Sequence, residues 1–557
     1  MALPALAALV VAVLVLGYRF YGRWVARQFV LDADRVTPAH RLADGIDFVP
    51  ARPFYLFGQH FSAIAAAGPI VGPILACSQF GWLPCLLWIG LGVVFIGAVH
   101  DVSTLIASVR HDGKTIAEVV KVHLGRPAWL AILLFIWLAL VYVIVAFVDI
   151  TAGTFVSDKV SADGVTTTFN QGGAVALAAV LYLGLALVMG LVNRFLRPPL
   201  WLQTILFVPA TLFVVWFGTQ HSTWLVLGWR EWVYLILGYC AVASVTPMWL
   251  LMQPRGYLGG FVLYGALLVG VIGIFFGGFS IEQPAWKGFD TPGQTGLLFP
   301  FLFVTIACGA CSGFHGLVCS GTTSKQIDKE PHCHPIGYGA MLLEAFVALI
   351  ALATIMIVAG KPSGGPGKTY AEGLARFITL LIGDSPEARQ TAVTFGAMAL
   401  STFVFDTLDS ATRLGRYILQ ELVDRRGLAS MVVTSLVTVG VPLYFLESAD
   451  KGSYVLFWTL FGTSNQLLAS LSLLAISVWL WRGGRRPWFT LVPMALVMAV
   501  TVTSLILQAR NLARFEVGTT PWLNGLVAVI LLGLAAALVG FAARAVRQTP
   551  AAARAAA

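Results

Sequence analysis

The sequence predicts an all-α polytopic membrane protein with about fifteen transmembrane helices, and both its composition and its apolar segments point to this fold class. Of the 557 residues, 58% are hydrophobic and only 11% are charged, whereas a soluble domain carries about 25% charged residues. Apolar segments recur along the whole chain, and each is close to the roughly 20 residues that a helix needs to cross a bilayer. The predicted spans are 2–18, 58–77, 81–109, 128–156, 172–192, 199–217, 232–252, 257–280, 296–320, 336–360, 390–408, 428–446, 453–481, 488–508 and 521–543.

The basic residues predict the orientation of these spans. If the N-terminus lies outside, 25 of the 35 Lys and Arg residues fall in loops on the inner side, as the positive-inside rule requires. An odd number of spans then places the C-terminus inside. The net charge of +9 is scattered over loops between spans, which favours cytoplasmic loops over nucleic-acid binding.

The span at 296–320 differs from a plain membrane helix. From Gly309 onward it consists of glycine, small hydroxyl residues and one histidine. Glycine loosens a helix and exposes its backbone, and non-helical backbone is tolerated in a membrane only where it is buried or lines a wet cavity. We therefore predict a broken helix that forms half of a binding site. Its candidate substrate or gate residues are Ser312, His315, Thr322, Thr323 and Lys325.

The span at 58–77 predicts the other half of that site. It contains two Gly-Pro pairs, at 68–69 and 72–73, and each proline removes a backbone donor and clashes with a preceding carbonyl. This span runs inside to outside, opposite to the span at 296–320, and opposed broken helices are typical of inverted-repeat secondary transporters with a site near the midplane. The alternative is that Gly and Pro are simply common in membrane helices. The candidate substrate residues here are Gln59, His60, Gly68 and Gly72.

Ionisable and hydroxyl groups inside spans are candidates for ion coupling. A charged side chain at the bilayer centre costs at least about 2.5–3.5 kcal/mol, so each one suggests a function. Hydroxyl groups could instead hold a sodium ion. The candidates are Asp101, Asp149, Ser401, Thr402, Asp406 and Asp409.

Several of these groups also have a structural interpretation. His100 and Asp101 could be a structural pair near the inner interface as well as a proton relay. Asp409 and Arg413 are four residues apart and could form an ion pair within one helix. Lys325 could extend to the interface as well as face an anionic substrate. We expect no metal site at the chelating residue types His332, Cys333 and His334, which lie in a short loop.

No enzyme motif is present in the sequence. There is no Walker motif, no G-x-S-x-G and no H-E-x-x-H, so we expect neither ATPase activity nor a cofactor. Transport would then be driven by a gradient of protons, or alternatively of sodium ions, or by the gradient of the substrate itself.

Longer motifs, in order along the chain, resemble the carbon starvation protein A family over residues 50–480. They are the segments 52–73, 80–84 and 97–101, Gln253-Pro254-Arg255, Ser312–His315 with Ser320–Lys325, Asp409 with Thr412, Arg413 and Arg416, and Phe461–Gln466. The resemblance implies a transporter of the bacterial inner membrane, induced in carbon starvation, that takes up pyruvate with protons or takes up peptides. It also implies a LeuT-like inverted repeat. Gly256 departs from the family, where Asp is expected, so we predict that Arg255 lacks an ion pair there.

The leading hypothesis is a secondary active importer of a small organic anion or short peptides, coupled to protons. It predicts an N-terminal helix and basic loop at 1–57, a transporter core at 58–481 and C-terminal helices with a cytoplasmic tail at 482–557. The expected partners are a small-molecule substrate and the lipid bilayer. The alternatives are a passive channel or facilitator and a starvation-sensing membrane protein.

Overall fold

Helices form nearly all of the chain, as the apolar composition predicts. The computed structural model describes residues 2–548 apart from 46, 157–168, 292–295, 361, 363, 426 and 450–452. Within this part, 12 helices are long and apolar enough to cross a membrane. They are Leu3–Phe29, Trp82–Arg110, α9 (Arg126–Phe155), α10 (Gln171–Phe195), α11 (Leu200–Gln220), α13 (Met252–Phe276), Glu330–Met356, α18 (Pro386–Leu422), α19 (Leu428–Glu447), Val455–Arg482, Trp488–Arg514 and α23 (Thr520–Arg547).

These helices coincide with twelve of the fifteen expected spans, and the remaining three are shorter or interrupted. The span at 58–77 is a pair of helices bent by 45°. The span at 232–252 contains α12 (Trp229–Val245), which has 17 residues. The span at 296–320 is divided into two short helices. The all-α membrane class is therefore confirmed, while the count of fifteen and the LeuT-like repeat stay predictions.

The chain forms two compact units, each assembled from segments that are distant in sequence. Unit 1 comprises Met1–Ala5, Leu140–Pro284 and Ile350–Phe457. Unit 2 comprises Leu6–Ala139, Ala285–Leu349 and Trp458–Ala557. The helices α1 (Leu3–Leu16), α9, α16 (Ala340–Met356) and α20 (Tyr454–Arg482) each contribute residues to both units.

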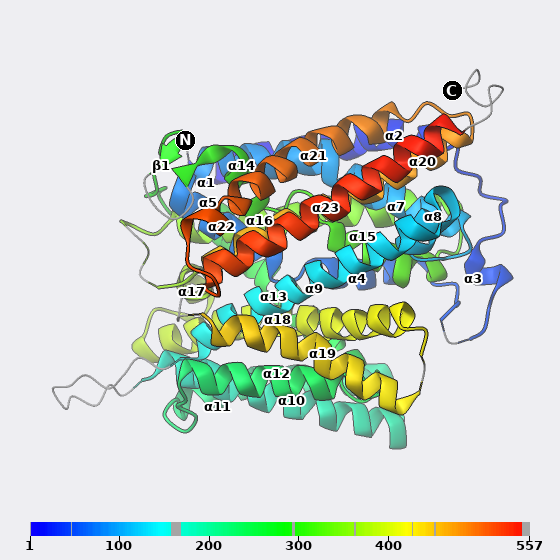
Figure 1. Ribbon diagram of the computed structural model, residues 1–557. Coiled ribbons are helices and arrows are strands. Elements are labelled where there is room, and N and C mark those ends of the chain that lie inside the picture. Colours follow the sequence, from blue (N-terminus) through cyan, green and yellow to red (C-terminus); the bar gives the residue numbers. More distant parts are fainter. Residues whose placement is uncertain are drawn as a thin grey trace. The chain divides into compact units, whose positions relative to one another are not determined.

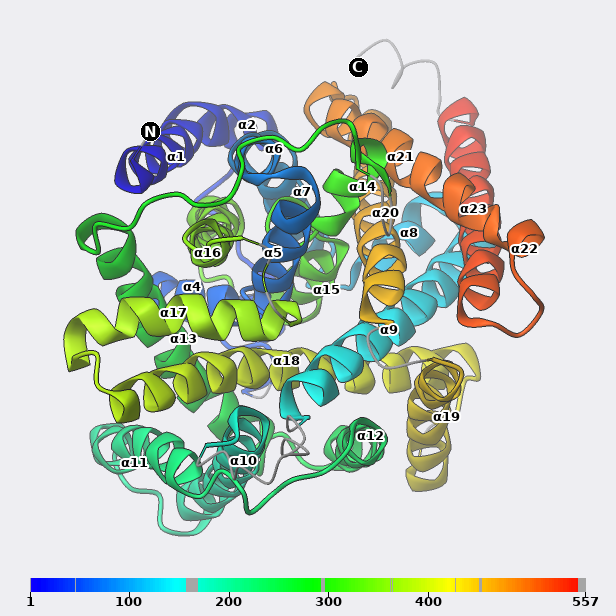
Figure 2. The ribbon, with the colours of Figure 1, turned by 90° about the vertical axis from the view of Figure 1, so that its left-hand side faces the viewer.

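Unit 1 is a bundle of long helices that pack closely where glycine faces a neighbour. Figure 1 shows α12 alongside α19, and Figure 2 shows α17 (Pro366–Ile382) alongside α18. Helix α13 packs against both α17 and α18. A Cβ on Gly373 would lie 2.6 Å from the carbonyl oxygen of Thr354, and one on Gly273 would lie 2.0 Å from the ring of Phe377. The small residues therefore set how closely these helices approach.

Unit 2 contains both interrupted spans and the helices that pack around them. The two strands are a short antiparallel pair in which Asp290 faces Leu297. The elements of this unit are α1 (Leu3–Leu16), α2 (Arg23–Phe29), α3 (Pro38–Arg41), α4 (Pro53–Ile64), α5 (Gly68–Phe80), α6 (Trp82–Leu87), α7 (Ala98–Arg110), α8 (Ile116–Leu124), β1 (Asp290–Thr291), β2 (Gly296–Leu297), α14 (Leu298–Thr305), α15 (Gly313–Gly321), α21 (Trp488–Ala509), α22 (Asn511–Arg514) and α23.

Candidate functional site

Both spans predicted to be broken are broken in the structure, and both breaks lie in unit 2. Helix α4 ends at Ile64, and Ala65 leaves the helical region with ψ 54°. Helix α14 ends at Thr305, Ile306 has ψ 65°, and α15 begins after Ser312, whose backbone is extended. Both predicted interruptions therefore exist, but the first lies at Ala65–Ala67, ahead of the two Gly-Pro pairs, and Pro73 lies inside the continuous helix α5.

The two breaks contact one another through glycine. A Cβ on Gly72 would lie 2.5 Å from the carbonyl oxygen of Thr305. A Cβ on Gly68 would lie 2.3 Å from the Sγ atom of Cys308. Neither position can carry a side chain without displacing its neighbour, so Gly68 and Gly72 bring the two interrupted helices together. This juxtaposition is what we predicted for the halves of one site.

Side chains from other helices bind the backbone that the second break frees. Trp88 Nε1 donates to the carbonyl of Ile306 at 3.1 Å, and Trp458 Nε1 donates to Thr305 at 3.0 Å. Gln466 Nε2 donates to the carbonyl of Phe303 at 2.9 Å. Unpaired carbonyls are costly inside a membrane, so these donors allow the helix to stay open.

Asn465 on α20 holds the start of α15. Its Oδ1 accepts the backbone N–H of Phe314 at 2.8 Å, and its Nδ2 donates to Ser312 Oγ at 3.0 Å. The amide thereby occupies one of the free N–H groups at this helix terminus, where partial positive charge favours an anion. Ser312 is fully buried against it.

A buried network of two histidines and two carboxylates lies beside the break. His315 on α15 places Nδ1 2.9 Å from Asp101 Oδ2 on α7, and Nε2 3.2 Å from Glu344 Oε2 on α16. The other oxygen of Asp101 lies 2.7 Å from Nδ1 of His100. No side chain in this network is more than 1% exposed. Figure 2 shows α7 and α15 side by side.

This geometry can store a proton. An imidazolium at His315 donates to a carboxylate from each ring nitrogen, whereas a neutral imidazole can serve only one of them. The Nε2 atom of His100 and the Oε1 atom of Glu344 are buried and make no hydrogen bond within the described residues, and Oε2 of Glu344 has only the 3.2 Å ion-pair contact with His315. Such a group of carboxylates and imidazoles has more negative sites than fixed positive ones, so its charge depends on the protons that it holds.

His60 and Thr323 form a second polar pair in unit 2. His60 Nδ1 lies 2.9 Å from Thr323 Oγ1, and both side chains are buried. The Sγ atom of Cys319 lies 3.9 Å from His60 Nε2. Two candidate residues that are 263 positions apart in sequence thus come together.

The remaining candidates of the first set lie towards the surface. Gln59 and Thr322 are exposed, and the hydroxyl of Thr322, which follows the last residue of α15, donates back to the carbonyl of Val318. Lys325 Nζ lies 3.8 Å from Asp47 Oδ2 and 5.4 Å above the ring of Phe48. Lys325 therefore faces the N-terminal arm of the chain, which we define as residues 30–52.

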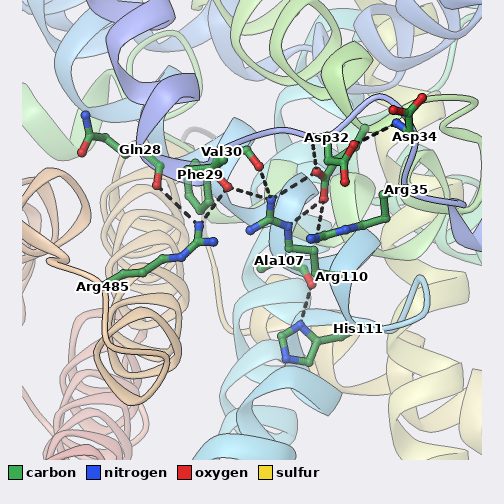
Figure 3. Close-up of polar contacts among 11 residues, drawn as sticks. Gln28, Phe29, Val30, Asp32, Asp34, Arg35, Ala107, Arg110, His111 and Arg485 are labelled. Carbon is green, nitrogen blue, oxygen red and sulfur yellow. Dashed lines mark hydrogen bonds and ion pairs between the residues drawn. The ribbon is translucent and has the colours of Figure 1, made fainter. Parts of the chain in front are cut away.

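The N-terminal arm is attached to the segment that follows α15. Ala51 donates its N–H to the carbonyl of Gln326 at 3.0 Å. Glu330, whose side chain is fully buried, accepts from Arg110 Nε at 2.7 Å, from Arg35 at 3.1 Å and from the backbone N–H of Asp32 at 2.8 Å. Figure 3 shows the three donor residues Arg110, Arg35 and Asp32 gathered together. We call these four residues the Glu330 cluster.

The second ionisable centre lies in unit 1, and it corrects our expectation for Arg255. We predicted that Arg255 lacks an ion pair, yet its Nη2 lies 2.6 Å from Asp406 Oδ1 and its Nη1 lies 2.5 Å from Asp409 Oδ2. Tyr239 also donates to Asp409 at 2.9 Å. The prediction was wrong because it searched the next position in the chain for a partner, whereas the partners lie on α18.

The interpretation of Asp409 and Arg413 as an ion pair within one helix is also wrong. Arg413 Nη2 donates to the carbonyls of Ala243 and Thr246 at 2.8 and 2.6 Å, while Asp409 belongs to Arg255. One arginine facing two aspartates leaves a net negative charge, and Oδ1 of Asp409 is buried with no hydrogen-bond partner in the described part of unit 1.

The other coupling candidates, Asp149, Ser401 and Thr402, make their contacts within unit 1. Asp149 accepts from Trp229 Nε1 at 2.9 Å. Ser401 Oγ donates to the carbonyl of Ala397 at 2.9 Å within α18, and the methyl group of Thr402 faces Gly259. Among the described residues, no three His, Cys, Asp or Glu side chains come together as they would to hold a metal ion, and this includes His332, Cys333 and His334.

Sequence reasoning missed several members of these centres. Glu344 was not among the predicted candidates. Asn465, Gln466 and Tyr239 were not candidates for a role. The signal for Glu344 was its charge in an apolar span, but only the fold shows that His315 is its partner.

Comparison with known proteins places these observations in one family. The sequence model of the family described as carbon starvation protein CstA matches residues 3–363 and 359–504. The peptide transporter CstA of Helicobacter pylori is 32% identical over 88% of this chain and 80% of its own length. The peptide transporter CstA of Escherichia coli K12 is 32% identical over 89% of this chain and 79% of its own length. The pyruvate/proton symporter BtsT of the same organism is 30% identical over 89% of this chain and 80% of its own length.

Solved structures are more distant. A manganese transporter of Eremococcus coleocola covers 91% of this chain and is itself covered to 99%, with 15% sequence identity and a TM-score of 0.45.

Proposed function

The chain belongs to the carbon starvation protein CstA family, and from this membership we propose that it is a proton-coupled secondary active importer of a small organic anion or of short peptides. Its many apolar helices and its relatives mark it as a multi-pass protein of the bacterial inner membrane. One relative is named a pyruvate/proton symporter, and others are named peptide transporters. Pyruvate and a peptide share a carboxylate, so one anion-binding centre could serve either class.

The observation that carries the proposal is His315 between Asp101 and Glu344. In this proposal the three side chains take up a proton from one side of the membrane and release it on the other. The imidazole links two carboxylates at 2.9 and 3.2 Å, so one added proton changes the charge of a region that has no solvent exposure. In a low-dielectric interior such a change strongly alters the interaction with an anionic substrate.

The substrate is proposed to bind where the two broken helices meet. His60, Thr323 and Ser312 offer the polar side chains there, and His315 offers a positive charge when it is protonated. The start of α15 adds the partial positive charge of a helix N-terminus. Asn465 would yield its contact with the N–H of Phe314 to a substrate carboxylate, because an ionised acceptor binds an N–H group more strongly than an amide does.

Asp406 and Asp409 are proposed as a second proton-accepting centre in unit 1. Arg255 balances one of their charges, and the second requires a proton or a cation. A proton is favoured over sodium, because one relative is named a pyruvate/proton symporter. On the orientation that the basic loops predict, the N-terminus is periplasmic and the C-terminus is cytoplasmic.

Uptake into proteoliposomes tests the proposed function. The purified protein would be reconstituted and given labelled pyruvate, alanine or a dipeptide, with an inward proton gradient, an inward sodium gradient or no gradient. We expect uptake above the external concentration with a proton gradient alone, and its collapse on addition of a protonophore. Flux that only equilibrates the substrate would show a passive facilitator, and the absence of flux for every compound would favour a sensor.

A further inference from the structure

A cavity at one end of unit 1 has the donor chemistry of a phosphate site. It has a volume of about 200 Å³ and is lined by Gly190, Asn193, Arg194, Arg197 and Trp249. These residues come from the end of α10, the segment that follows it, and the turn before α13. A Cβ on Gly190 would lie 2.3 Å from the carbonyl oxygen of Leu250, so the helix and the turn are in close contact at the base of the cavity.

The cavity contains positive charge with no acidic residue in its lining. Neither Arg194 nor Arg197 forms an ion pair or a side-chain hydrogen bond with any residue that the structure describes. Arg194 lies over the ring of Trp249, with its guanidinium carbon 5.6 Å from the ring centroid. This contact positions one guanidinium without using its N–H donors.

The remaining lining atoms add donors. Asn193 Oδ1 accepts from Gln203 Nε2 at 3.4 Å, which leaves its amide N–H groups free to donate into the cavity. The carbonyl of Val192 at the end of α10 already accepts the N–H groups of Leu196 and Arg197 at 2.9 and 3.2 Å. The negative end of the helix is therefore partly capped. Two guanidinium groups and an amide supply N–H donors of the kind that bind the oxygens of a phosphate group.

The surroundings of the cavity distinguish a lipid from a free ion. Large apolar side chains beside it are strongly exposed: Phe195 and Leu196 at 75%, Trp201 at 63% and Leu200 at 60%. Exposed apolar groups of this size next to basic groups and a tryptophan are typical of the membrane interface. Acyl chains would cover these side chains while the phosphate occupies the cavity.

We propose that this cavity binds the headgroup phosphodiester of an anionic phospholipid. Arg194 and Arg197 hold the phosphate oxygens, Asn193 donates to a third oxygen, and the exposed apolar side chains of residues 195–201 lie against the acyl chains. On the orientation that the basic loops predict, the lipid belongs to the cytoplasmic leaflet. This binding site is separate from the proposed transport mechanism and does not depend on it.

Native mass spectrometry of the detergent-purified full chain tests the proposal. Phosphatidylglycerol, phosphatidylcholine and inorganic phosphate would be titrated separately, and phosphate would be added to the phosphatidylglycerol complex. We expect tight binding of phosphatidylglycerol that Arg194→Gln with Arg197→Gln weakens about 30-fold, as the loss of two basic side chains near an anionic lipid implies. Arg425→Gln with Arg544→Gln removes the same charge from exposed sites outside the cavity and should leave binding unchanged.

A second variant guards against misfolding of the first. Asn193→Asp places a negative charge at the exposed edge of the cavity and should weaken phosphatidylglycerol binding, while the melting temperature of the lipid-free protein is kept. Equal binding to the double arginine variant and to the wild type would overturn the proposal. So would equal retention of phosphatidylcholine, or displacement of the lipid by inorganic phosphate, which would make the cavity a site for a free anion.

Discussion

His315 Nδ1 lies 2.9 Å from Asp101 Oδ2, and it joins two helices that are more than 200 residues apart in sequence. Asp101 lies on the regular helix α7, whereas His315 lies on α15, which exists as a separate helix only because its span is broken. In the proposed function, a change of protonation at this contact acts on one half of the interrupted span. This coupling of charge to a broken helix is what a proton-driven transporter requires.

Glu344→Gln should uncouple transport from the proton gradient. The amide cannot take up a proton, but it keeps the shape of the carboxyl group and faces His315 in the same way. We expect uphill uptake to be lost while exchange of labelled for unlabelled substrate continues, since exchange needs no net proton movement. Folding should be preserved, because His315 keeps Asp101 as its counter-ion at 2.9 Å.

His315→Gln is the matched comparison for that variant. It leaves Asp101 and Glu344 without their shared cation, and breaking a buried pair in this way costs about 3–5 kcal/mol. The melting temperature of His315→Gln should therefore fall well below that of Glu344→Gln. If Glu344→Gln keeps full uphill uptake, this network does not carry the coupling proton.

Asp406→Asn tests the centre in unit 1. Asp406 is 27% exposed, whereas Asp409 is fully buried, so Asp406 is the carboxylate that solvent can reach. Arg255 keeps Asp409 as its partner in this variant, and the centre becomes neutral. We expect the protein to stay folded and uphill uptake to fail, with exchange retained.

Arg255→Gln is the contrasting change at that centre. It leaves two carboxylates together without a cation, and we expect a loss of stability of about 3–5 kcal/mol, seen as a lower melting temperature. Unchanged uphill uptake in Asp406→Asn would restrict this centre to a structural role.

Gly72→Ala should disrupt the contact between the two breaks. The new Cβ would lie 2.5 Å from the carbonyl oxygen of Thr305, and backbone cannot give way there without moving α14. We expect destabilisation of about 1–3 kcal/mol, as overpacking typically costs, and a large loss of transport. Gly184→Ala is the control, because a Cβ there meets nothing within 4 Å and alanine favours the helix. Equal behaviour of the two variants in thermal unfolding would contradict the close approach.

The positions of both breaks could be predicted from sequence because their causes are local. The ring of Pro69 would clash with the carbonyl of Ala65 in a continuous helix, and α4 ends just before Ala65, whereas Pro73 is accommodated inside α5. Gly309 and Gly313 weaken the other span locally. The side chains that bind the carbonyls freed by the second break could not be predicted. Trp88 and Trp458 donate to carbonyls more than 150 positions away, and an apolar span that contains tryptophan gives no sign of such a contact.

The candidate sites divide in the same way. His60, His315 and Asp101 stand out as polar groups in apolar spans, and the structure joins them to buried partners. The partner of Arg255 was missed because an ion pair across helices depends on packing, for which one sequence holds no local signal. Lys325 and Thr322 were grouped with the site because they continue its motif, yet the span ends before them and they lie at the surface.

Glu330→Gln should loosen the N-terminal arm. The carboxylate is fully buried and Arg110 is 8% exposed, so the amide would leave a largely buried guanidinium without its counter-ion. We expect a loss of about 3–5 kcal/mol and faster cleavage of the arm by protease.

Glu118→Gln provides the matched control for the Glu330 cluster. Glu118 pairs with Lys121 at 3.1 Å, with both side chains substantially exposed, and a surface pair is worth about 0–1 kcal/mol. Equal melting temperatures for Glu330→Gln and Glu118→Gln would show that the cluster does not hold the arm.

The paired histidines His111 and His123 predict a pH dependence of stability. Their Nε2 atoms lie 2.8 Å apart, and His111 Nδ1 lies 2.6 Å from the carbonyl of Ala107. Burial lowers the pKa of His111, with Lys114 adding to the shift and Asp112 opposing it. Burial, with help from His111 and Arg482, lowers the pKa of His123 to about 4.

The sign of the effect follows from these shifts. An unfolded histidine has a pKa of about 6.5, so the unfolded chain binds more protons than the folded one between that value and about 4. The stability that the pair contributes is complete above about pH 6.5 and is lost as the pH falls through this window. Two imidazolium rings could not keep the contact, since their N–H groups would face each other.

Thermal unfolding between pH 7.5 and pH 5 measures this loss. The melting temperature of the wild type should fall with pH, and the double change of His111→Gln and His123→Gln should flatten that dependence. His221→Gln removes a histidine that stacks on Phe217 outside the pair and should leave the slope as it is. A slope that is the same in all three proteins would mean that other groups govern the acid sensitivity, because the pair is the only change that distinguishes the double variant.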